Sequence, residues 1–129
     1  MKYIKIMGIL TLLCGLFGCK TQNNKFLSLS VDEYEKVITD TEVVRLDVRT
    51  AEEYAEGHIE GTLNIDVLKS DFKSKAKATI PKDKTIAVNC RSGKRSKNAA
   101  HILSKLGYKV IELDTGYNGW KDAGKPIVK

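Results

Sequence analysis

Residues 85–100, TIAVNCRSGKRSKNAA, contain the features that decide the fold and the chemistry of this chain. The segment 85–89 is a short apolar run typical of a buried strand, and Cys90 follows it directly. Gly93 permits a positive φ, so the chain can turn tightly after the cysteine. A helical pattern begins at residue 95. A strand, a tight loop and a helix in this order predict that Cys90 lies at the carboxyl end of a strand.

Predicted strands and helices alternate along the rest of the chain. Strands are predicted at 26–30, 42–48, 85–89 and 109–113, with a short extended piece within 61–66. Helices are predicted at 31–39, 51–57, 67–77, 95–106 and 117–121. Ser30 with Glu33, and Thr50 with Glu53, follow the capping-box pattern of helix starts. This alternation predicts an α/β fold with a mainly parallel central sheet and helices on both faces.

Polar residues also end a second predicted strand. Asp47 and Arg49 lie at the end of the strand at 42–48, as Cys90 lies at the end of its own strand. In a parallel sheet the carboxyl ends of the strands and the loops that leave them form the ligand crevice. We therefore expect these three side chains to meet at one edge of the sheet.

The loop after Cys90 is strongly basic. Arg91, Lys94 and Arg95 follow the cysteine within five positions. The amides of a tightly turned loop form a site for anions, and the start of the next helix adds positive potential. These groups favour the thiolate form of the cysteine and would bind a small oxyanion beside it. A nucleophile beside an anion pocket indicates an enzyme.

Composition and charge limit the number of domains, the partners and the cofactors that the chain can have. The chain has 129 residues, which suits one domain, and 22 basic against 16 acidic residues give a net charge of +6. The charges are too interspersed to indicate a nucleic-acid partner. Lysines between residues 69 and 84 are interpreted as a solvated surface, with a membrane-facing patch as the alternative. After residue 25 the chain has two histidines and one cysteine, so we expect no metal site and no cofactor.

The N-terminus is predicted to be a targeting segment. Residues 1–18 carry two early lysines and an apolar run that is too short for a bilayer span, which needs about 20 helical residues. The run ends in LFGC, which resembles the lipobox of bacterial lipoproteins and would make Cys19 the lipidated residue. A plain secretory signal is the alternative. Residues 19–25 are then a lipidated cysteine with a polar tether, and 26–129 form the domain.

This processing determines which thiols remain in the mature protein. Cys14 lies within the apolar run and would be removed, while Cys19 would be acylated. Cys90 would then be the only free thiol of a protein anchored in the bacterial cell envelope, facing the periplasm or the exterior. A lone unpaired cysteine in an exported protein indicates a reactive thiol. A buried structural cysteine fits less well, because Arg91 follows at once and Gly93 opens a turn.

Three blocks of sequence carry a resemblance to a known family. They are LDVRTAEEYAEGHIEGTLNI at 46–65, CRSGKRS at 90–96 and TGYNGW at 115–120. In this order and spacing the chain resembles the rhodanese-like domains of the single-domain thiosulfate sulfurtransferases. The third block departs from the pattern, because Thr115 replaces the first of two glycines. The local turn is therefore the part of the fold that the resemblance leaves open.

The resemblance implies a reaction and roles for the loop. The Cys90 thiolate attacks the outer sulfur of thiosulfate or a related donor, sulfite leaves, and the persulfide passes its sulfur to an acceptor thiol or to cyanide. Donor binding is expected to fall to the remaining loop residues, which are Arg91, Ser92, Gly93, Lys94, Arg95 and Ser96. Asp47 and Arg49 are expected to brace the loop rather than to react.

Two other functions remain open. The first is a module without catalytic activity that binds persulfides or partner proteins through the same pocket. The second is an enzyme of the phosphatase or arsenate-reductase kind, which uses a related cysteine loop. Phosphatases have five residues between cysteine and arginine, whereas four separate Cys90 from Arg95 here. The shorter loop favours sulfur transfer over phosphate chemistry.

Three other residues are given structural roles. His58 follows a glycine at a turn, so we expect it to make a structural hydrogen bond. His101 falls off the apolar face of its helix and is expected to be solvated. Trp120 is expected to close the C-terminal helix onto the sheet.

Overall fold

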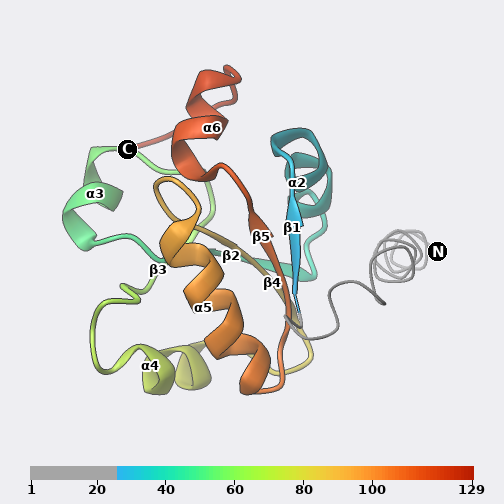
Figure 1. The fold of residues 1–129 in the computed structure, drawn as a ribbon, viewed down its shortest axis with the longest axis vertical. Helices are drawn as coiled ribbons and strands as arrows, with labels where there is room; N and C mark the ends of the chain where they lie inside the picture. Colours follow the sequence, from blue (N-terminus) through green and yellow to red (C-terminus); the bar gives the residue numbers. More distant parts are fainter. Residues whose placement is uncertain (1–25) are drawn as a thin grey trace.

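A computed structural model describes residues 26–129, which form a five-stranded sheet with helices around it (Figure 1). The strand order is β1-β5-β4-β2-β3, and every pair of neighbours is parallel. The strands are β1 (Leu27–Leu29), β2 (Val43–Asp47), β3 (Leu63–Asn64), β4 (Thr85–Asn89) and β5 (Lys109–Leu113). The predicted α/β class and parallel sheet are therefore confirmed. The predicted targeting segment, with Cys14 and Cys19, lies outside the described residues.

Five helices connect and follow the strands. They are α2 (Val31–Ile38), α3 (Ala51–Glu56), α4 (Phe72–Thr79), α5 (Lys94–Lys105) and α6 (Gly116–Asp122). Both predicted capping boxes are present, each with its side-chain oxygen 3.2 Å from the backbone nitrogen of the glutamate. None of the helices in residues 26–129 is long and apolar enough to cross a bilayer.

The prediction of a helix over 67–77 was wrong at its start. Residues 67–71 form turns, and α4 begins only at Phe72. The Asp66 carboxylate accepts a hydrogen bond from the amide of Leu68 at 2.9 Å, which satisfies that amide outside a helix. Val67 is buried in the core, so the backbone at this residue is placed to point the side chain into the core, and the helix starts only after it.

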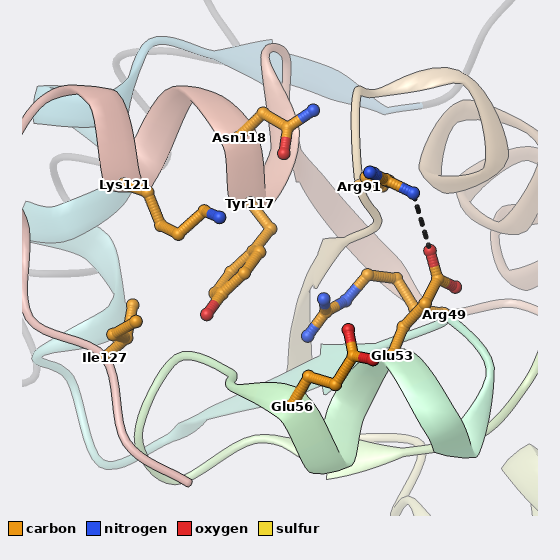
Figure 2. A pocket seen from close by; sticks show the side chains of 8 residues that line it. All are labelled: Arg49, Glu53, Glu56, Arg91, Tyr117, Asn118, Lys121 and Ile127. Atoms are coloured by element: carbon orange, nitrogen blue, oxygen red, sulfur yellow. Dashed lines mark ion pairs between the residues drawn. The ribbon is translucent and has the colours of Figure 1, made fainter.

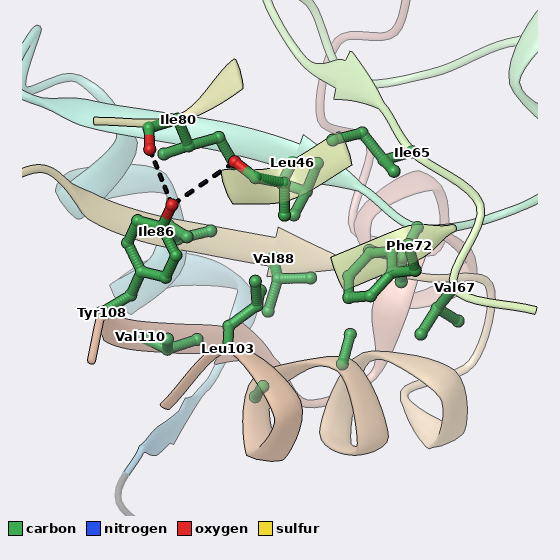
Figure 3. Close-up of a cluster of buried hydrophobic side chains, with 14 of the residues drawn as sticks. Leu46, Ile65, Val67, Phe72, Ile80, Ile86, Val88, Leu103, Tyr108 and Val110 are labelled. Atoms are coloured by element: carbon green, nitrogen blue, oxygen red, sulfur yellow. Dashed lines mark hydrogen bonds between the residues drawn. The ribbon is translucent and has the colours of Figure 1, made fainter. Parts of the chain in front are cut away.

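Alternate residues of the central strands build two apolar cores. On one face Ile86 and Val88 of β4 pack with α4 and α5 (Figure 3). On the other face Ala87 packs with α2 and α6, where Trp120 is buried and meets Tyr34 edge to face with ring centroids 6.3 Å apart. The predicted core position of Trp120 is confirmed. Burial on both faces explains why TIAVN is a nearly continuous apolar run.

Tyr108 fastens the end of α4 to the start of β5. Its hydroxyl donates to the carbonyl of Ile80 at 2.7 Å and lies 3.3 Å from that of Ala76 (Figure 3). The Ala76 carbonyl also accepts the amide of Ile80 at 2.9 Å. The Ile80 carbonyl is therefore the group that depends on the tyrosine for its hydrogen bond.

Candidate active site

The loop Cys90–Ser96 lies between the carboxyl end of β4 and the first turn of α5. Gly93 has φ of 104°, as the tight turn requires, and its amide donates to the Cys90 sulfur at 3.1 Å. The Ser96 hydroxyl oxygen lies 3.5 Å from the same sulfur. Cys90 is only 1% exposed and belongs to the apolar core facing α5. The sequence pattern disfavoured a buried cysteine at this position, so the burial of Cys90 differs from that expectation. The buried sulfur nevertheless has polar contacts.

The start of α6 holds the backbone of this loop. The amide of Tyr117 donates to the Cys90 carbonyl at 2.8 Å, and that of Asn118 donates to the Arg91 carbonyl at 2.9 Å. The backbone of Gly116, with φ of 68°, lies so close that an added Cβ would sit 2.5 Å from the Arg91 carbonyl oxygen. Glycine at position 116 therefore allows α6 to approach the loop.

Thr115 does not disturb this approach. It has φ of −95° in the right-handed region, where any L-residue fits, so the turn needs only the second glycine of the family pattern. Its side chain occupies the space beside Gly119, where an added Cβ would clash with Thr115, at 1.9 Å from its Oγ1 and 2.5 Å from its Cβ. The threonine is thus accommodated by the glycine four residues later.

Asp47 and Arg49 form a buried ion pair beside the loop. Arg49 donates to both Asp47 oxygens, the shorter distance being 2.8 Å, and to the Gly57 carbonyl at 2.7 Å. Its guanidinium carbon also lies 4.2 Å from the centroid of the Tyr117 ring. Arg49 therefore connects the end of β2, the end of α3 and the start of α6, which is the geometry of a brace.

Arg95 lies at the edge of the loop, but its side chain is hydrogen-bonded to Glu53 of α3. Its two terminal nitrogens donate to the two Glu53 oxygens at 2.8 and 3.0 Å. The hydrogen bond from Arg95 lowers the pKa of Glu53 to about 2, and the same bond raises the pKa of Arg95. Arg91 reaches Glu53 only at 4.0 Å and stays largely exposed. Among the described residues Lys94 and Ser92 have no polar partner and face solvent.

A buried carboxylate behind the loop was not predicted. Glu112 of β5 is fully buried and accepts the Ser96 hydroxyl at 2.7 Å. Its other oxygen pairs with Lys97 at 3.1 Å and with the hydroxyl of Ser28. A single glutamate in the otherwise apolar segment VIEL was the signal in the sequence, because an isolated charge in a central strand needs partners.

A pocket of about 250 Å³ opens between α3, α6 and the first residue after Cys90 (Figure 2). Its lining residues are Arg49, Glu53, Glu56, Arg91, Tyr117, Asn118, Lys121 and Ile127. In Figure 2 the Tyr117 ring lies between Lys121 and Arg49, and both cations are within cation–π distance of it. Three cations and two carboxylates thus surround a small opening beside the loop.

The two histidines take no part in this region. His58 Nδ1 is 2.8 Å from the carbonyl of Tyr54, and the two rings stack with centroids 3.7 Å apart. His101 is exposed on α5. Both agree with the structural roles predicted for them. Within residues 26–129 no group of three or more His, Cys, Asp or Glu side chains could hold a metal ion.

Comparison with known protein families assigns this chain to one of them. The family model described as "Rhodanese-like domain" matches residues 30–123. The chain belongs to the rhodanese-like domain family. The predicted resemblance is thereby confirmed for the domain.

Two relatives and one solved structure illustrate the match to rhodanese-like proteins. "Thiosulfate sulfurtransferase PspE" of Escherichia coli K12 is 35% identical over 85 residues, covering 65% of this chain and 77% of that protein. A "Sulfurtransferase" of Allochromatium vinosum is 37% identical over 93 residues, covering 70% and 84%. The crystal structure of a rhodanese-related protein of Thermoplasma volcanium is 31% identical, covers 79% of this chain and 97% of that one, and has a TM-score of 0.71. A rhodanese-type sulfurtransferase is the class of activity that these relatives support.

Proposed function

We propose that this protein moves sulfane sulfur from thiosulfate to a thiol or to cyanide through a persulfide on Cys90. The observation that carries the proposal is the Gly93 amide, which points at the Cys90 sulfur from 3.1 Å within a loop rimmed by cations. An amide fixed in this way stabilises negative charge on sulfur without reorganising during the reaction. The names of the relatives agree with this chemistry.

In the first half-reaction the Cys90 thiolate attacks the outer sulfur of thiosulfate. A new S–S bond forms to Cys90, the S–S bond of the donor breaks, and its electron pair leaves with sulfite. In the second half-reaction an acceptor thiolate or cyanide attacks the outer sulfur of the persulfide. The electron pair of that bond returns to Cys90 as the thiolate, so the two halves give ping-pong kinetics.

The loop side chains contribute unequally to donor binding in this proposal. Arg91 lines the pocket and Lys94 is an exposed cation of the same loop, and both attract the sulfonate end of the donor. Arg95 is paired with Glu53 and acts mainly by fixing the start of α5. Ser92 faces solvent, whereas Ser96 lies beside the reacting sulfur.

Phosphate chemistry is the second candidate, and the loop geometry disfavours it. With five residues between cysteine and arginine, the arginine would stand at position 96, but that residue is Ser96, whose hydroxyl oxygen lies 3.5 Å from the sulfur. Arg95, which precedes it, has both terminal nitrogens on Glu53. A phosphatase needs a guanidinium that is free to hold two oxygens of the phosphate group. A module that only binds persulfides differs from the proposed enzyme in having no turnover.

One experiment separates the three functions. The purified protein is treated with thiosulfate and its intact mass is measured, with Cys90→Ser as the control. We expect the mass of one added sulfur in the wild type and none in the variant, and loss of that sulfur when cyanide is added. A wild-type protein that gains no sulfur but hydrolyses aryl phosphates would overturn the assignment. A persulfide that cyanide cannot discharge would indicate a binding module.

We further propose that Cys19 is lipidated and that the domain faces outward from a membrane of the bacterial cell envelope. The support is the apolar run that ends in LFGC and the polar residues KTQNN after it. An anchor of this kind leaves Cys90 as the only free thiol of the mature chain.

A further inference from the structure

The pocket between α3 and α6 extends beyond the loop that binds the donor in the proposed transfer steps (Figure 2). Its wall is joined to that loop, because the amide of Tyr117 donates to the Cys90 carbonyl at 2.8 Å and that of Asn118 donates to the Arg91 carbonyl at 2.9 Å. The Arg91 side chain belongs to both the loop and the pocket lining. A molecule held in this pocket therefore lies next to the loop that carries the proposed nucleophile.

The Tyr117 hydroxyl is a polar group of a buried residue, and it has no hydrogen-bond partner within residues 26–129. The residue is only 6% exposed, yet it lines the pocket. The guanidinium of Arg49 lies 4.2 Å from the ring centroid, and the hydroxyl oxygen lies 2.5 Å from the position that a Cβ on Gly57 would take. A hydroxyl can both donate and accept a hydrogen bond. This one is held in a fixed place and is available to a ligand.

The charged side chains of the pocket differ in whether the protein already pairs them. Arg49 and Glu53 are both in close ion pairs with other side chains. Glu56 of α3 and Lys121 of α6 extend into the pocket from two different helices, and neither has an ion pair in the described part of the chain. Lys121 has only a cation–π contact, 5.1 Å from the centroid of the Tyr117 ring. An unpaired carboxylate and an unpaired ammonium in one pocket match a ligand that carries both an ammonium and a carboxylate.

Thiosulfate alone does not explain this pair of charges. It carries only negative charge, so Glu56 would repel it. The volume of about 250 Å³ is below the range of roughly 300–1,000 Å³ that is usual for drug-sized ligands, so the pocket suits a smaller molecule. Ile127 adds an apolar side chain to the lining, which suits a methylene group. A small molecule with an ammonium, a carboxylate and a short apolar stem is an amino acid.

We propose that this pocket binds the α-amino acid group of the acceptor, a low-molecular-weight thiol with an ammonium and a carboxylate on the same carbon atom. Lys121 and the Tyr117 hydroxyl hold the carboxylate, Glu56 holds the ammonium, and the thiol extends toward the loop. The clause that makes this molecule the acceptor rests on the proposed function, whereas its binding in the pocket does not.

The transfer to such an acceptor is a complete half-reaction. The acceptor thiol loses its proton to water, and its thiolate attacks the outer sulfur of the Cys90 persulfide. A new S–S bond forms to the acceptor, the S–S bond to Cys90 breaks, and the electron pair of that bond returns to Cys90 as the thiolate. The product is the persulfide of the amino acid. Holding the acceptor by both of its charged groups positions its sulfur for this attack.

Binding of S-methyl-L-cysteine tests the pocket without any sulfur transfer, because the methylated sulfur cannot accept sulfur. Amide NMR spectra of the unloaded protein should show saturable shifts at Tyr117 and Asn118. Glu56→Gln and Lys121→Gln should each weaken binding about fivefold, as expected for an exposed ion pair. Tyr117→Phe should weaken binding without lowering the melting temperature, because its hydroxyl bonds to no group of the described chain.

Two matched variants control for the change in charge. Glu52→Gln removes a carboxylate from the exposed side of α3, and Lys109→Gln removes an ammonium from the start of β5; neither residue lines the pocket. Both should bind S-methyl-L-cysteine as the wild type does. A wild type without saturable binding would overturn the inference. Binding that Glu56→Gln, Lys121→Gln and Tyr117→Phe all leave unchanged would overturn it as well.

Discharge of the preformed persulfide tests whether the bound molecule is the acceptor. We expect L-cysteine to remove the sulfur faster than D-cysteine in the wild type, and Glu56→Gln and Lys121→Gln each to slow L-cysteine about fivefold. The rate with 2-mercaptoethanol, which has neither charged group, should stay the same. A general change of electrostatic potential would act with opposite sign in the two variants, so slowing in both indicates direct contacts.

The outcomes separate the pocket from the proposed function. If the wild type binds S-methyl-L-cysteine but takes up no sulfur from thiosulfate, the proposed function fails and the binding site stands. If the persulfide forms but S-methyl-L-cysteine does not bind, the proposed function stands and the inference fails. If S-methyl-L-cysteine binds as described but L-cysteine discharges the wild type and both variants equally fast, the clause about the acceptor is overturned.

Discussion

Glu53 and Arg95 join the start of α3 to the first turn of α5 through two parallel hydrogen bonds, at 2.8 and 3.0 Å. One Glu53 oxygen also caps α3 by accepting the amide of Thr50 at 3.0 Å. The same carboxylate thus caps the start of α3 and holds Arg95 near the end of the loop that follows Cys90. Capping residues usually serve only their own helix, so this double contact couples the loop to α3.

The Glu53–Arg95 pair predicts a pH dependence of stability. Because Arg95 lowers the pKa of Glu53 to about 2, the stabilisation is fully present above the ordinary pKa of about 4.5 and disappears as the pH falls to about 2. The difference in free energy of unfolding between wild type and Glu53→Gln should be constant from pH 5 upward and shrink toward zero near pH 2. Urea unfolding at several pH values measures it.

Glu56→Gln is the control for this experiment, because Glu56 is exposed on the same helix and has no ion pair among the described residues. Its difference from wild type should show no comparable change between pH 5 and 2. A Glu53→Gln difference that stays constant down to pH 2 would contradict the role assigned to the pair.

The loop should tolerate no side chain at Gly93. Gly93 and Gly107 have almost the same φ, 104° and 103°, so an alanine at either position carries similar backbone strain of about 1–2 kcal/mol. Only at Gly93 would the added Cβ collide with the Asp114 carbonyl, whereas at Gly107 its nearest neighbour is the end of Lys82 at 3.8 Å. Gly93→Ala should lose sulfur transfer and more stability than Gly107→Ala. Equal losses of stability, with activity retained in both, would show that the close approach is unimportant.

Arg91 should contribute to donor binding rather than to the chemical step. Its side chain is 65% exposed and its contact with Glu53 is long, at 4.0 Å. Because an exposed charge contributes about 1 kcal/mol or less, Arg91→Ala should raise the KM for thiosulfate about fivefold and leave kcat nearly unchanged. Steady-state kinetics at low and high salt measure this, and the effect should weaken with salt. A large fall in kcat with unchanged KM would place Arg91 in the chemical step instead.

The lipoprotein proposal predicts the behaviour of Cys19→Ser. Fractionation of cells that express the wild type should place the protein in the membrane and label it with acyl chains, because several acyl chains together bind a bilayer strongly. The variant should be released from the membrane or remain unprocessed, while purified domains of both should transfer sulfur equally. Membrane association that survives the substitution would contradict the lipobox interpretation.

Tyr108→Phe tests the link between α4 and β5. The substitution keeps the ring in the core and removes the hydrogen bond to the Ile80 carbonyl, which has no second donor among the described contacts. Loss of one such buried bond should lower the free energy of unfolding by about 1 kcal/mol. Sulfur transfer should be unchanged, because Tyr108 lies at the opposite end of β5 from the loop. An unaltered stability would mean that water replaces the hydroxyl.

The order of the elements, both capping boxes and the position of Cys90 after β4 could be predicted from the sequence alone. These features depend on residues close together in the chain, such as Thr50 with Glu53 or the apolar run before Cys90, so local physical chemistry determines them. The family followed from the same local blocks. The start of α4 was mispredicted, because the burial of Val67 overrides the helical pattern there.

The partners of the loop could be found only in the tertiary structure. Arg95 was expected to face the donor, but Glu53, 42 positions earlier, takes both its terminal nitrogens. Glu112 reaches Ser96 only because β5 pairs with β4 in this register, with Glu112 beside Val88. Hydrogen bonds between distant segments depend on strand order and helix packing, which no local pattern encodes. The sequence by itself therefore determined which residue we propose as the nucleophile, and the tertiary structure decided which charges surround it.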